Sequence, residues 1–399
     1  MLTALEWLFW IASFVVVYPY VGYPLVLATS NRFFPRNSDK ANGLINNVEL
    51  LTADKMPSVT LIVSAFNEAA VIREKLVNAL SLDYPEGLLQ VIVVSDGSTD
   101  GTDEIVEEYV ASDSRVRLVR LESQSGKSAG LNQAVPLATG EIVVFSDANA
   151  MYEYDALLRL VEPFSEGKVG YTVGSALYQE DATEAVNDSE GLYWKYELWI
   201  KRLESAFFSV VGGDGAIYAI RRELFQPLDP IDISDFVNPI QIVAAGYRGV
   251  FLSGARSYEG GTEEFSDEFR RKRRIVNRSW GAVRRHIGLF SIKRHPRFLF
   301  MLISHKVIRW WSVAFVVLAL VAGLVLALQP ESGLYQLLTF GIAGSVLLAL
   351  VGWRLEKLGQ AMPRFVYLPY YFYLLGIASL MGIADNFKGR SYATWTHHR

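Results

Sequence analysis

Two apolar segments of this 399-residue chain each end abruptly in an aspartate. Residues 91–95 read Val-Ile-Val-Val-Ser before Asp96, and residues 142–146 read Ile-Val-Val-Phe-Ser before Asp147. Small and turn-forming residues follow both carboxylates. In open α/β sheets, ligands bind at the carboxyl ends of the strands, where loops are exposed and helices begin. The pattern therefore predicts that both aspartates face a ligand, and that Asp96 accepts hydrogen bonds from a base or a ribose.

Two further aspartates, Asp214 and Asp235, lie in similar positions among small residues. Carboxylates are hard oxygen ligands that suit Mg²⁺ or Mn²⁺, and such an ion would neutralise a diphosphate. The ion would act as a Lewis acid on a leaving group, while another carboxylate serves as a general base toward a hydroxyl. The alternative is a helix cap or a turn. We prefer that alternative for Asp103 and Asp155, at predicted helix starts, and leave it open for Asp214.

Several other chemistries do not fit the sequence. Residues 125–128 read Ser-Gly-Lys-Ser, like the end of a phosphate-binding loop, but that motif requires a glycine where this chain has Leu121. Residues 96–107 imitate part of a calcium loop, which needs a helix on both sides, whereas a strand is predicted before Asp96. The chain has no cysteine, and its five histidines all lie at or beyond position 286. Thiol chemistry and a histidine-based metal site in the central region are therefore excluded.

Strands and helices alternate through the central part of the chain. This alternation predicts an α/β fold with a mostly parallel, Rossmann-like sheet and right-handed crossovers. The pattern becomes less regular after Asp147. The predicted strands are residues 59–65, 90–95, 116–121, 141–146, 216–220 and 249–252, and the predicted helices are 69–80, 102–109, 127–138, 192–203 and 235–245.

Apolar segments flank this central region, in a chain with 51% hydrophobic residues. Each is long enough to cross, or nearly cross, the roughly 30 Å hydrocarbon core of a bilayer. The first lacks a basic leader and a small-residue cleavage site, so it is predicted to be an anchor rather than a signal peptide. Basic residues follow it, which predicts a cytoplasmic position for the central domain. The segments are residues 5–29, 310–328, 333–353 and 365–384.

The number of apolar segments leaves the side of the C-terminus open. One span before the domain and three after it would place the tail on the opposite face. Lys388, Arg390 and Arg399 favour the same face as the domain. Either the last segment is re-entrant or interfacial, or the charge rule fails at the tail.

A strongly basic segment separates the central region from the last three apolar segments. Residues 270–297 contain eleven lysines and arginines and no acid. At helical spacing, Val276, Trp280, Val283 and Ile287 share one face, and Arg271, Arg274, Arg278 and Arg285 share another. The pattern predicts amphipathic helices in the membrane interface, with their cations toward anionic headgroups. The adjoining apolar segments argue against a nucleic-acid partner.

Six short motifs occur together in this chain. They are Val-Ser-Ala-Phe-Asn-Glu at 63–68, Ser-Asp-Gly-Ser-Thr-Asp-Gly-Thr at 95–102, Gly-Lys-Ser-Ala-Gly-Leu-Asn at 126–132, Phe-Ser-Asp-Ala-Asn at 145–149, Gly-Asp-Gly-Ala-Ile-Tyr at 213–218 and Ser-Asp-Phe at 234–236. As a set they resemble the motifs of membrane-embedded glycosyltransferases of family 2, which have a GT-A catalytic domain and are related to cellulose, chitin and hyaluronan synthases. The resemblance covers about residues 57–256.

The resemblance implies a nucleotide-sugar site. Asp96 would bind the uracil or ribose of the donor, and Ala65, Asn67 and Glu68 would lie alongside it. Lys127 would approach the nucleotide or its diphosphate.

The resemblance also implies the chemical step. Asp147 and Asn149 stand where the family has an Asp-x-Asp motif, which handles the ribose, the sugar and the metal ion, Mg²⁺ or Mn²⁺. Asn149 replaces the second aspartate, so a ligand remains but one negative charge is lost. Asp235 would be the base that deprotonates the acceptor hydroxyl for in-line attack, with inversion at the anomeric carbon.

One departure from the family concerns processive synthases, which carry a Gln-x-x-Arg-Trp motif on an interfacial helix. This chain has Asn-Arg-Ser-Trp at 277–280 instead. Arg278 would contact the diphosphate and Trp280 or Asp214 the acceptor, or Arg278 and Trp280 would simply bind the membrane surface.

The domains expected are an N-terminal transmembrane helix (1–30), a linker (31–56), a GT-A domain (57–256), basic interfacial helices (257–309) and a C-terminal transmembrane region (310–399). The expected function is an inverting, metal-dependent transfer from a nucleotide-diphosphate sugar, UDP-linked, to a lipid-linked or growing surface-glycan acceptor. It would occur on the cytoplasmic face of the membrane, the inner membrane in a bacterium. A processive synthase and exporter stays open, as does a non-catalytic nucleotide sensor on a degenerate fold.

Overall fold

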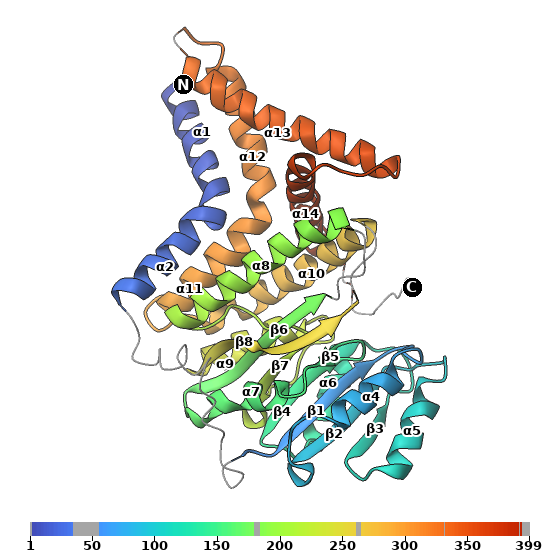
Figure 1. Cartoon of the computed structure of the whole chain (residues 1–399). Helices are drawn as coiled ribbons and strands as arrows, with labels where there is room; N and C mark the ends of the chain where they lie inside the picture. The colour runs from blue at the N-terminus through green and yellow to red at the C-terminus, as the bar shows by residue number, and fades with distance from the viewer. Residues whose placement is uncertain are drawn as a thin grey trace.

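The structure, a computed structural model, describes residues 2–34, 56–178, 184–260, 265–330, 332–390 and 392; for residues 178 and 184–192 it describes the backbone only. Nearly all of the predicted linker at 31–56 therefore lies outside the described residues. Figure 1 shows an α/β domain at one end of the molecule and a group of long helices at the other.

The α/β domain contains an eight-stranded sheet. Its strands are β1 (Val59–Ala65), β2 (Leu89–Ser95), β3 (Val116–Arg120), β4 (Ile142–Asp147), β5 (Met151–Tyr152), β6 (Val169–Tyr178), β7 (Tyr218–Arg221) and β8 (Arg248–Glu259). They are arranged in the order β3-β2-β1-β4-β7-β6-β8-β5. The first four are parallel, and β7 is antiparallel to both of its neighbours. The predicted α/β class with a mostly parallel sheet is confirmed.

Helices cover both faces of the sheet, which explains why apolar residues run without interruption through its central strands. All seven residues of β1 are buried, as are six of the seven in β2. The helices of the domain are α4 (Ile72–Leu80), α5 (Thr102–Ser112), α6 (Lys127–Ala134), α7 (Ala156–Val161), α8 (Glu184–Phe207) and α9 (Ser234–Ala244).

Several helices and strands begin or end at residues other than those predicted. Helix α4 begins three residues later than predicted because the chain first turns back on itself, with the Val71 amide donating to the Glu68 carbonyl. Helix α6 ends at Ala134 because Pro136, which lacks an N–H, follows in a short 3₁₀ turn. The sequence patterns missed β5, β6 and α7, and β8 continues beyond the predicted strand at 249–252.

Among the described residues, four helical stretches are long and apolar enough to cross a membrane: 2–33, 296–326, 333–357 and 364–387. The first comprises α1 (Leu2–Val17), a π-helical turn that contains Pro19, and α2 (Tyr23–Phe33). The second comprises α11 (Pro296–Leu302), another π-helical turn (Ile303–Val307) and α12 (Ile308–Leu326). The last two are α13 (Gly333–Lys357) and α14 (Arg364–Phe387).

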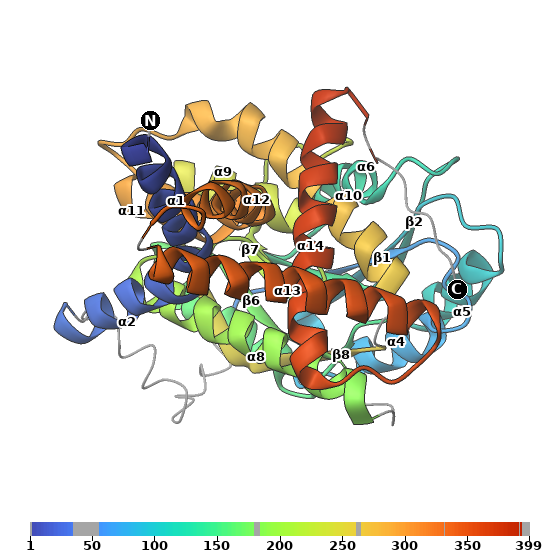
Figure 2. The same cartoon turned by 90° about the horizontal axis from the view of Figure 1, so that it is seen from above.

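These long helices are not all parallel. Helices α1 and α12 lie side by side and run away from the sheet, whereas α14 runs crosswise to α12 (Figures 1 and 2). Helix α10 (Phe265–His286) lies along α14. The Phe265 ring meets the Tyr367 ring at 5.7 Å, and Arg273 binds Asp385 at 2.6 Å further along the pair. Helix α14 therefore rests on α10 over most of its length.

This packing corrects the prediction for the basic segment. The cations of α10 do not point outward to lipid as a set, because Arg271, Arg274 and Arg278 line a cavity beside the α/β domain. Buried residues Val276 and Ala282 of the same helix join the main apolar core. Helix α10 is thus packed between the domain and α14.

Candidate active site

The carboxyl ends of β1, β2 and β4 lie side by side at one edge of the sheet. The register pairs Ala65 with Ser95 and Ser64 with Asp147. Asp96 and Asp147, predicted from separate segments, therefore project from strands that flank β1 on either side. This is the edge at which open α/β sheets bind their ligands.

Asp96 holds a loop in place. Its carboxylate is only 5% exposed and accepts hydrogen bonds from the amides of Ser125, at 2.7 Å, and Gly126, at 2.9 Å. Burial raises the pKa of Asp96, although these two amides favour its charged form. Asp96 thus connects the end of β2 to the loop that begins α6.

The turn after β1 is fastened to the same loop region as Asp96. The Asp96 amide donates to the Ala65 carbonyl at 2.9 Å. Asn67 has φ of 54°, in the left-handed region, and its Oδ1 accepts a hydrogen bond from the Thr99 amide at 2.8 Å. The Glu68 amide donates to Thr102 Oγ1 at 2.8 Å. Ala65, Asn67, Glu68 and Asp96, which the resemblance assigned to the nucleotide, are gathered at one place.

A second group of polar residues surrounds Gly215. The Lys127 ammonium lies 2.5 Å from Asp147 Oδ1 and donates to the Gly215 carbonyl at 3.3 Å. A Cβ atom at position 215 would lie 3.4 Å from Lys127 Nζ, 3.5 Å from Asp147 Oδ2 and 3.7 Å from Asp235 Oδ2. Three of the predicted residues therefore converge on a space that stays open because residue 215 is glycine.

Asp235 lies in the first turn of α9, and its backbone carbonyl accepts a hydrogen bond from the Gly213 amide. This bond ties the start of α9 to the turn that contains Gly215. Burial raises the pKa of Asp235, Lys127 opposes that rise, and Asp214 and Asp147 add to it. A carboxylate whose proton affinity is raised in this way is suited to accept a proton from a hydroxyl.

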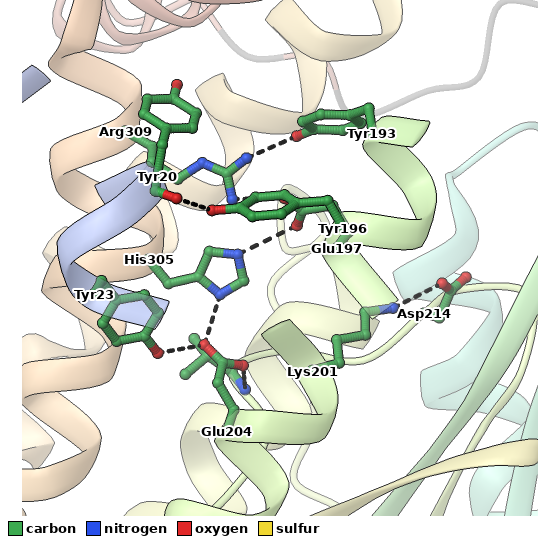
Figure 3. Close-up of polar contacts among 11 residues, drawn as sticks. Tyr20, Tyr23, Tyr193, Tyr196, Glu197, Lys201, Glu204, Asp214, His305 and Arg309 are labelled. Atoms are coloured by element: carbon green, nitrogen blue, oxygen red, sulfur yellow. Dashed lines mark hydrogen bonds and ion pairs between the residues drawn. The ribbon is translucent and has the colours of Figure 1, made fainter. Parts of the chain in front are cut away.

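Asp214 is paired with a lysine that the sequence reading did not single out. The Lys201 ammonium of α8 lies 3.1 Å from Asp214 Oδ2. Figure 3 shows this pair beside a separate set of polar contacts between α8 and the long apolar helices. Asp214 therefore has an ion-pair partner that holds its turn in place. This agrees with the alternative, left open above, that Asp214 is a turn residue and not a ligand-binding one.

This set of contacts holds α8 to the apolar stretches 2–33 and 296–326 (Figure 3). His305 is 1% exposed, and its ring nitrogens lie 2.6 Å from Glu204 Oε1 and 3.2 Å from Glu197 Oε2. Arg309 lies 2.6 Å from Glu197, and the Tyr23 hydroxyl of α2 donates to Glu204 at 2.6 Å. Burial opposes ionisation of Glu197, but Arg309 and His305 hold its pKa well below the usual range.

A cavity of about 460 Å³ lies between the sheet edge, α8, α10 and α14. Lys127, Asp147, Asp214 and Asp235 line it together with Glu259, at the end of β8. Burial beside Asp147 and Asp214 raises the pKa of Glu259 to about 8. No sequence pattern had marked Glu259. Arg274 also lines this cavity. The sequence did mark this residue, because helical spacing predicted it on the same cationic face of α10 as Arg278.

The structure separates Arg278 from Trp280. Arg278 lines the cavity, and its guanidinium donates to the carbonyls of Ile231, at 2.9 Å, and Asp232. It therefore holds the loop that leads into α9 and Asp235. Trp280 does not line this cavity; its ring packs against Trp310 at 6.3 Å.

The residues present fit a metal ion that is shared with a diphosphate. Within the described part of the chain, no three His, Cys, Asp or Glu side chains are placed to hold an ion by themselves. Asp147 nevertheless offers a carboxylate oxygen toward the open space at Gly215, and the partly exposed Asn149 lies two residues further along the same turn. Oxygen ligands in small number, completed by phosphate oxygens and water, are the usual arrangement for Mg²⁺.

Comparison with known proteins agrees with this fold. Residues 60–228 match the family described as Glycosyl transferase family 2. The chain is 39% identical over 117 residues to a beta-monoglucosyldiacylglycerol synthase of Nostoc sp.. This alignment covers 29% of this chain and 25% of that protein. It is 30% identical over 122 residues to a poly-beta-1,6-N-acetyl-D-glucosamine synthase of Staphylococcus epidermidis, which covers 30% of this chain and 29% of that protein. The aligned segments thus span about a quarter of the length of these relatives.

A solved structure extends the likeness of the fold to nearly the whole chain. The mannosyltransferase of Pyrobaculum calidifontis in complex with GDP-Man and Mn²⁺ superposes with a TM-score of 0.67 at 22% identity. The superposition covers 97% of this chain and all of that one. The superposition shows that the chain has the GT-A fold of that mannosyltransferase, and residues 60–228 within it match the family 2 model.

Proposed function

We propose that this protein transfers a sugar, with inversion, from a nucleotide-diphosphate sugar to a lipid-linked or growing surface-glycan acceptor. The observation that carries the proposal is the convergence of Lys127, Asp147 and Asp235 on the space left open by Gly215. That space belongs to a cavity whose far wall includes Tyr371 and Leu375 of the apolar helix α14. A polar reaction centre thus opens toward a helix suited to contact lipid.

The chain's own residues would divide the work between donor and acceptor. The nucleotide end of the donor would lie along the carboxyl ends of β1 and β2, beside Asn67 and Asp96. A UDP-linked donor is the choice we favour. Lys127 would meet the diphosphate, and Asp235 would take the proton of the acceptor hydroxyl. The oxygen of that hydroxyl then bonds to the anomeric carbon as the bond to the nucleoside diphosphate breaks, so one displacement inverts the configuration.

Asp147 and Asn149 would hold a divalent ion, Mg²⁺ or Mn²⁺, together with the diphosphate. When bound, such an ion neutralises the charge that develops on the leaving diphosphate. Lys127 supplies a positive charge to the same place from the protein itself, at 2.5 Å from Asp147. The lysine would thus supply to the diphosphate part of the positive charge that an ion held with one carboxylate fewer brings less strongly.

We further propose that the catalytic domain lies on the cytoplasmic side and that α14 lies in the membrane interface. Helix α14 contacts the arginine-rich α10 from Phe265 to Asn277, a distance of about 18 Å at 1.5 Å per residue. A helix that packs along a charged helix over that length lies at the same depth in the membrane as the charged helix. This supports the interfacial alternative for the last apolar segment, and it leaves the C-terminal end on the same side as the domain.

The first test is nucleotide release by the lipid-reconstituted protein across a panel of UDP-, GDP- and dTDP-sugars, with Mg²⁺ or Mn²⁺ and with a chelator. We expect metal-dependent release from one UDP-sugar. Release from no donor, together with no donor binding by calorimetry, would exclude the proposed activity.

The second test separates binding from chemistry at Asp235. Asp235→Asn should retain donor affinity while turnover falls by about 10²- to 10⁴-fold, because the base is removed but the donor contacts remain. Asp83→Asn, the same change at an exposed residue, serves as the matched control and should behave as the wild type. Turnover that survives in Asp235→Asn would assign the base elsewhere.

A further inference from the structure

Two lysines of the cavity have no counter-ion of their own. Lys272 of α10 and Lys306 of the π-helical turn before α12 both line the cavity. Among the described residues, neither ammonium group makes a hydrogen bond or an ion pair. Burial, next to the positive charges of Arg309 and Lys306, lowers the pKa of Lys272 to about 8. Two half-buried ammonium groups that repel each other are costly unless an anion joins them.

The carboxylates nearest to these lysines are already engaged. Glu197 binds Arg309 at 2.6 Å and His305 at 3.2 Å. Glu268 binds Arg271 at 2.8 Å. The protein therefore supplies cations in excess at this end of the cavity, which leaves room for a ligand that brings its own negative charge.

These lysines line the cavity from other elements than the proposed donor and base residues. Lys272 comes from α10 and Lys306 from the π-helical turn before α12. Lys127 comes from the start of α6, Asp147 from the end of β4 and Asp235 from α9. A donor diphosphate held at Lys127 would therefore not by itself supply a counter-ion to the lysine pair.

The surroundings of the lysine pair are apolar on the membrane side. Tyr371 and Leu375 of α14 line the same cavity, as does Ile275 of α10. Lys306 itself lies inside an apolar helical stretch, residues 296–326, that is long enough to cross a membrane. An anion bound here would therefore have a polar reaction centre on one side and hydrocarbon on the other.

We infer that Lys272 and Lys306 bind the phosphate of a lipid-linked acceptor, whose sugar extends from there toward Asp235. The inference rests on the proposed function, since it names the acceptor class of the same site. A lipid phosphate has two sources, a prenyl (di)phosphate that carries the acceptor sugar and a phospholipid headgroup of the bilayer. The geometry points to the first, because the lysines line the reaction cavity itself.

The experiment measures lipid binding by the full chain in neutral phosphatidylcholine nanodiscs, with three probes: a long-chain polyprenyl phosphate, the matching polyprenol and phosphatidylglycerol. The variants are the double substitution Lys272→Gln and Lys306→Gln, and the control Lys195→Gln, an exposed lysine of α8. Wild type and control should bind the prenyl phosphate at least about tenfold more tightly than the prenol, as charge-assisted hydrogen bonds provide. The double variant should bind both alike.

Equal binding of the two prenyl lipids by the wild type, or preference retained in the double variant, would overturn the inference. Equal competition by phosphatidylglycerol would assign the lysines to bilayer headgroups and overturn it as well. Nucleotide-sugar binding is measured on the same samples and should be unchanged in the double variant. Because lipid binding needs no turnover, failure of the proposed transferase activity and failure of this inference are separate results.

Discussion

The ammonium of Lys127 lies 2.5 Å from the carboxylate of Asp147, across the gap between the start of α6 and the end of β4. The pair borders the space at Gly215, which Asp235 closes from α9. Lys127 and Asp147 are twenty residues apart and Asp235 is much further along the chain, so only the folded sheet edge brings them together. The site's chemistry depends on that space remaining open.

Gly215→Ala fills this space with one methyl group. The new Cβ would lie 3.4–3.7 Å from three polar atoms, which is ordinary contact, so the fold should tolerate it. The methyl group should nevertheless exclude the donor's sugar diphosphate, and we expect donor affinity to fall by about tenfold or more. Calorimetric titration with the nucleotide sugar measures this. Gly87→Ala, where a Cβ meets nothing within 4 Å, is the control; similar donor affinity in both variants would place the donor elsewhere.

Arg278→Ala tests whether this arginine positions the base. Without its hydrogen bonds to the carbonyls of Ile231 and Asp232, the loop before Asp235 should loosen. A small displacement of a catalytic group is costly, so kcat should fall by about 10- to 100-fold while the donor's Kd stays unchanged. Arg270→Ala, at a side chain 59% exposed on the same helix, should have no effect. A higher Kd for the donor in Arg278→Ala would instead mean that Arg278 contacts the diphosphate directly. A loss of membrane association alone would mean that Arg278 contacts lipid.

Glu259 gives the site a defined dependence on pH. Its pKa rises from 4.5 to about 8 in the folded protein, so the unfolded chain releases this proton first. Its contribution to stability is therefore complete below about pH 4.5 and is lost as the pH rises through about 8. Glu259→Gln removes this loss. We expect its Tm to fall less than that of the wild type between about pH 6 and pH 9; Glu104→Gln, at an exposed position, should follow the wild type. Parallel Tm profiles for Glu259→Gln and wild type would contradict this.

His305→Ala should weaken the attachment of α8 to the apolar stretch 296–326. It removes one partner of Glu197 and one of the fully buried Glu204, which keeps its hydrogen bonds from Tyr23 and from the Val211 amide. The loss of hydrogen bonds to buried charged groups costs about 1–3 kcal/mol. Thermal unfolding in detergent should show a clear drop in Tm, whereas His295→Ala, at a partly exposed position, should show little change. A Tm for His305→Ala within a degree or so of the wild type would mean that the cluster is not needed for this attachment.

The amino-acid sequence determined the class of the domain because the relevant signals are local. Continuous β-branched runs at 59–65 and 91–95 indicate strands buried on both faces, and the aspartate that ends the second marks a ligand-facing edge. Turn residues after Asp96 and Asp147 indicate where the helices and loops must begin. The motifs around these positions carried the resemblance to family 2 glycosyltransferases, and the family match at 60–228 and the superposed fold confirm it.

Other features depend on contacts between distant segments, and only the tertiary structure decided them. The helical spacing of the residues in α10 predicted a cationic face, but this periodicity does not identify the residues that the face contacts. Arg278 proved to meet the loop before Asp235, and Trp280 packed against Trp310 instead of the cavity. His305 was one of several histidines outside the domain until folding placed it between Glu197 and Glu204. Charge and hydropathy are local properties of a chain. The partner of a buried charge depends instead on packing between distant segments, as for His305, which lies more than a hundred residues from Glu197 and Glu204.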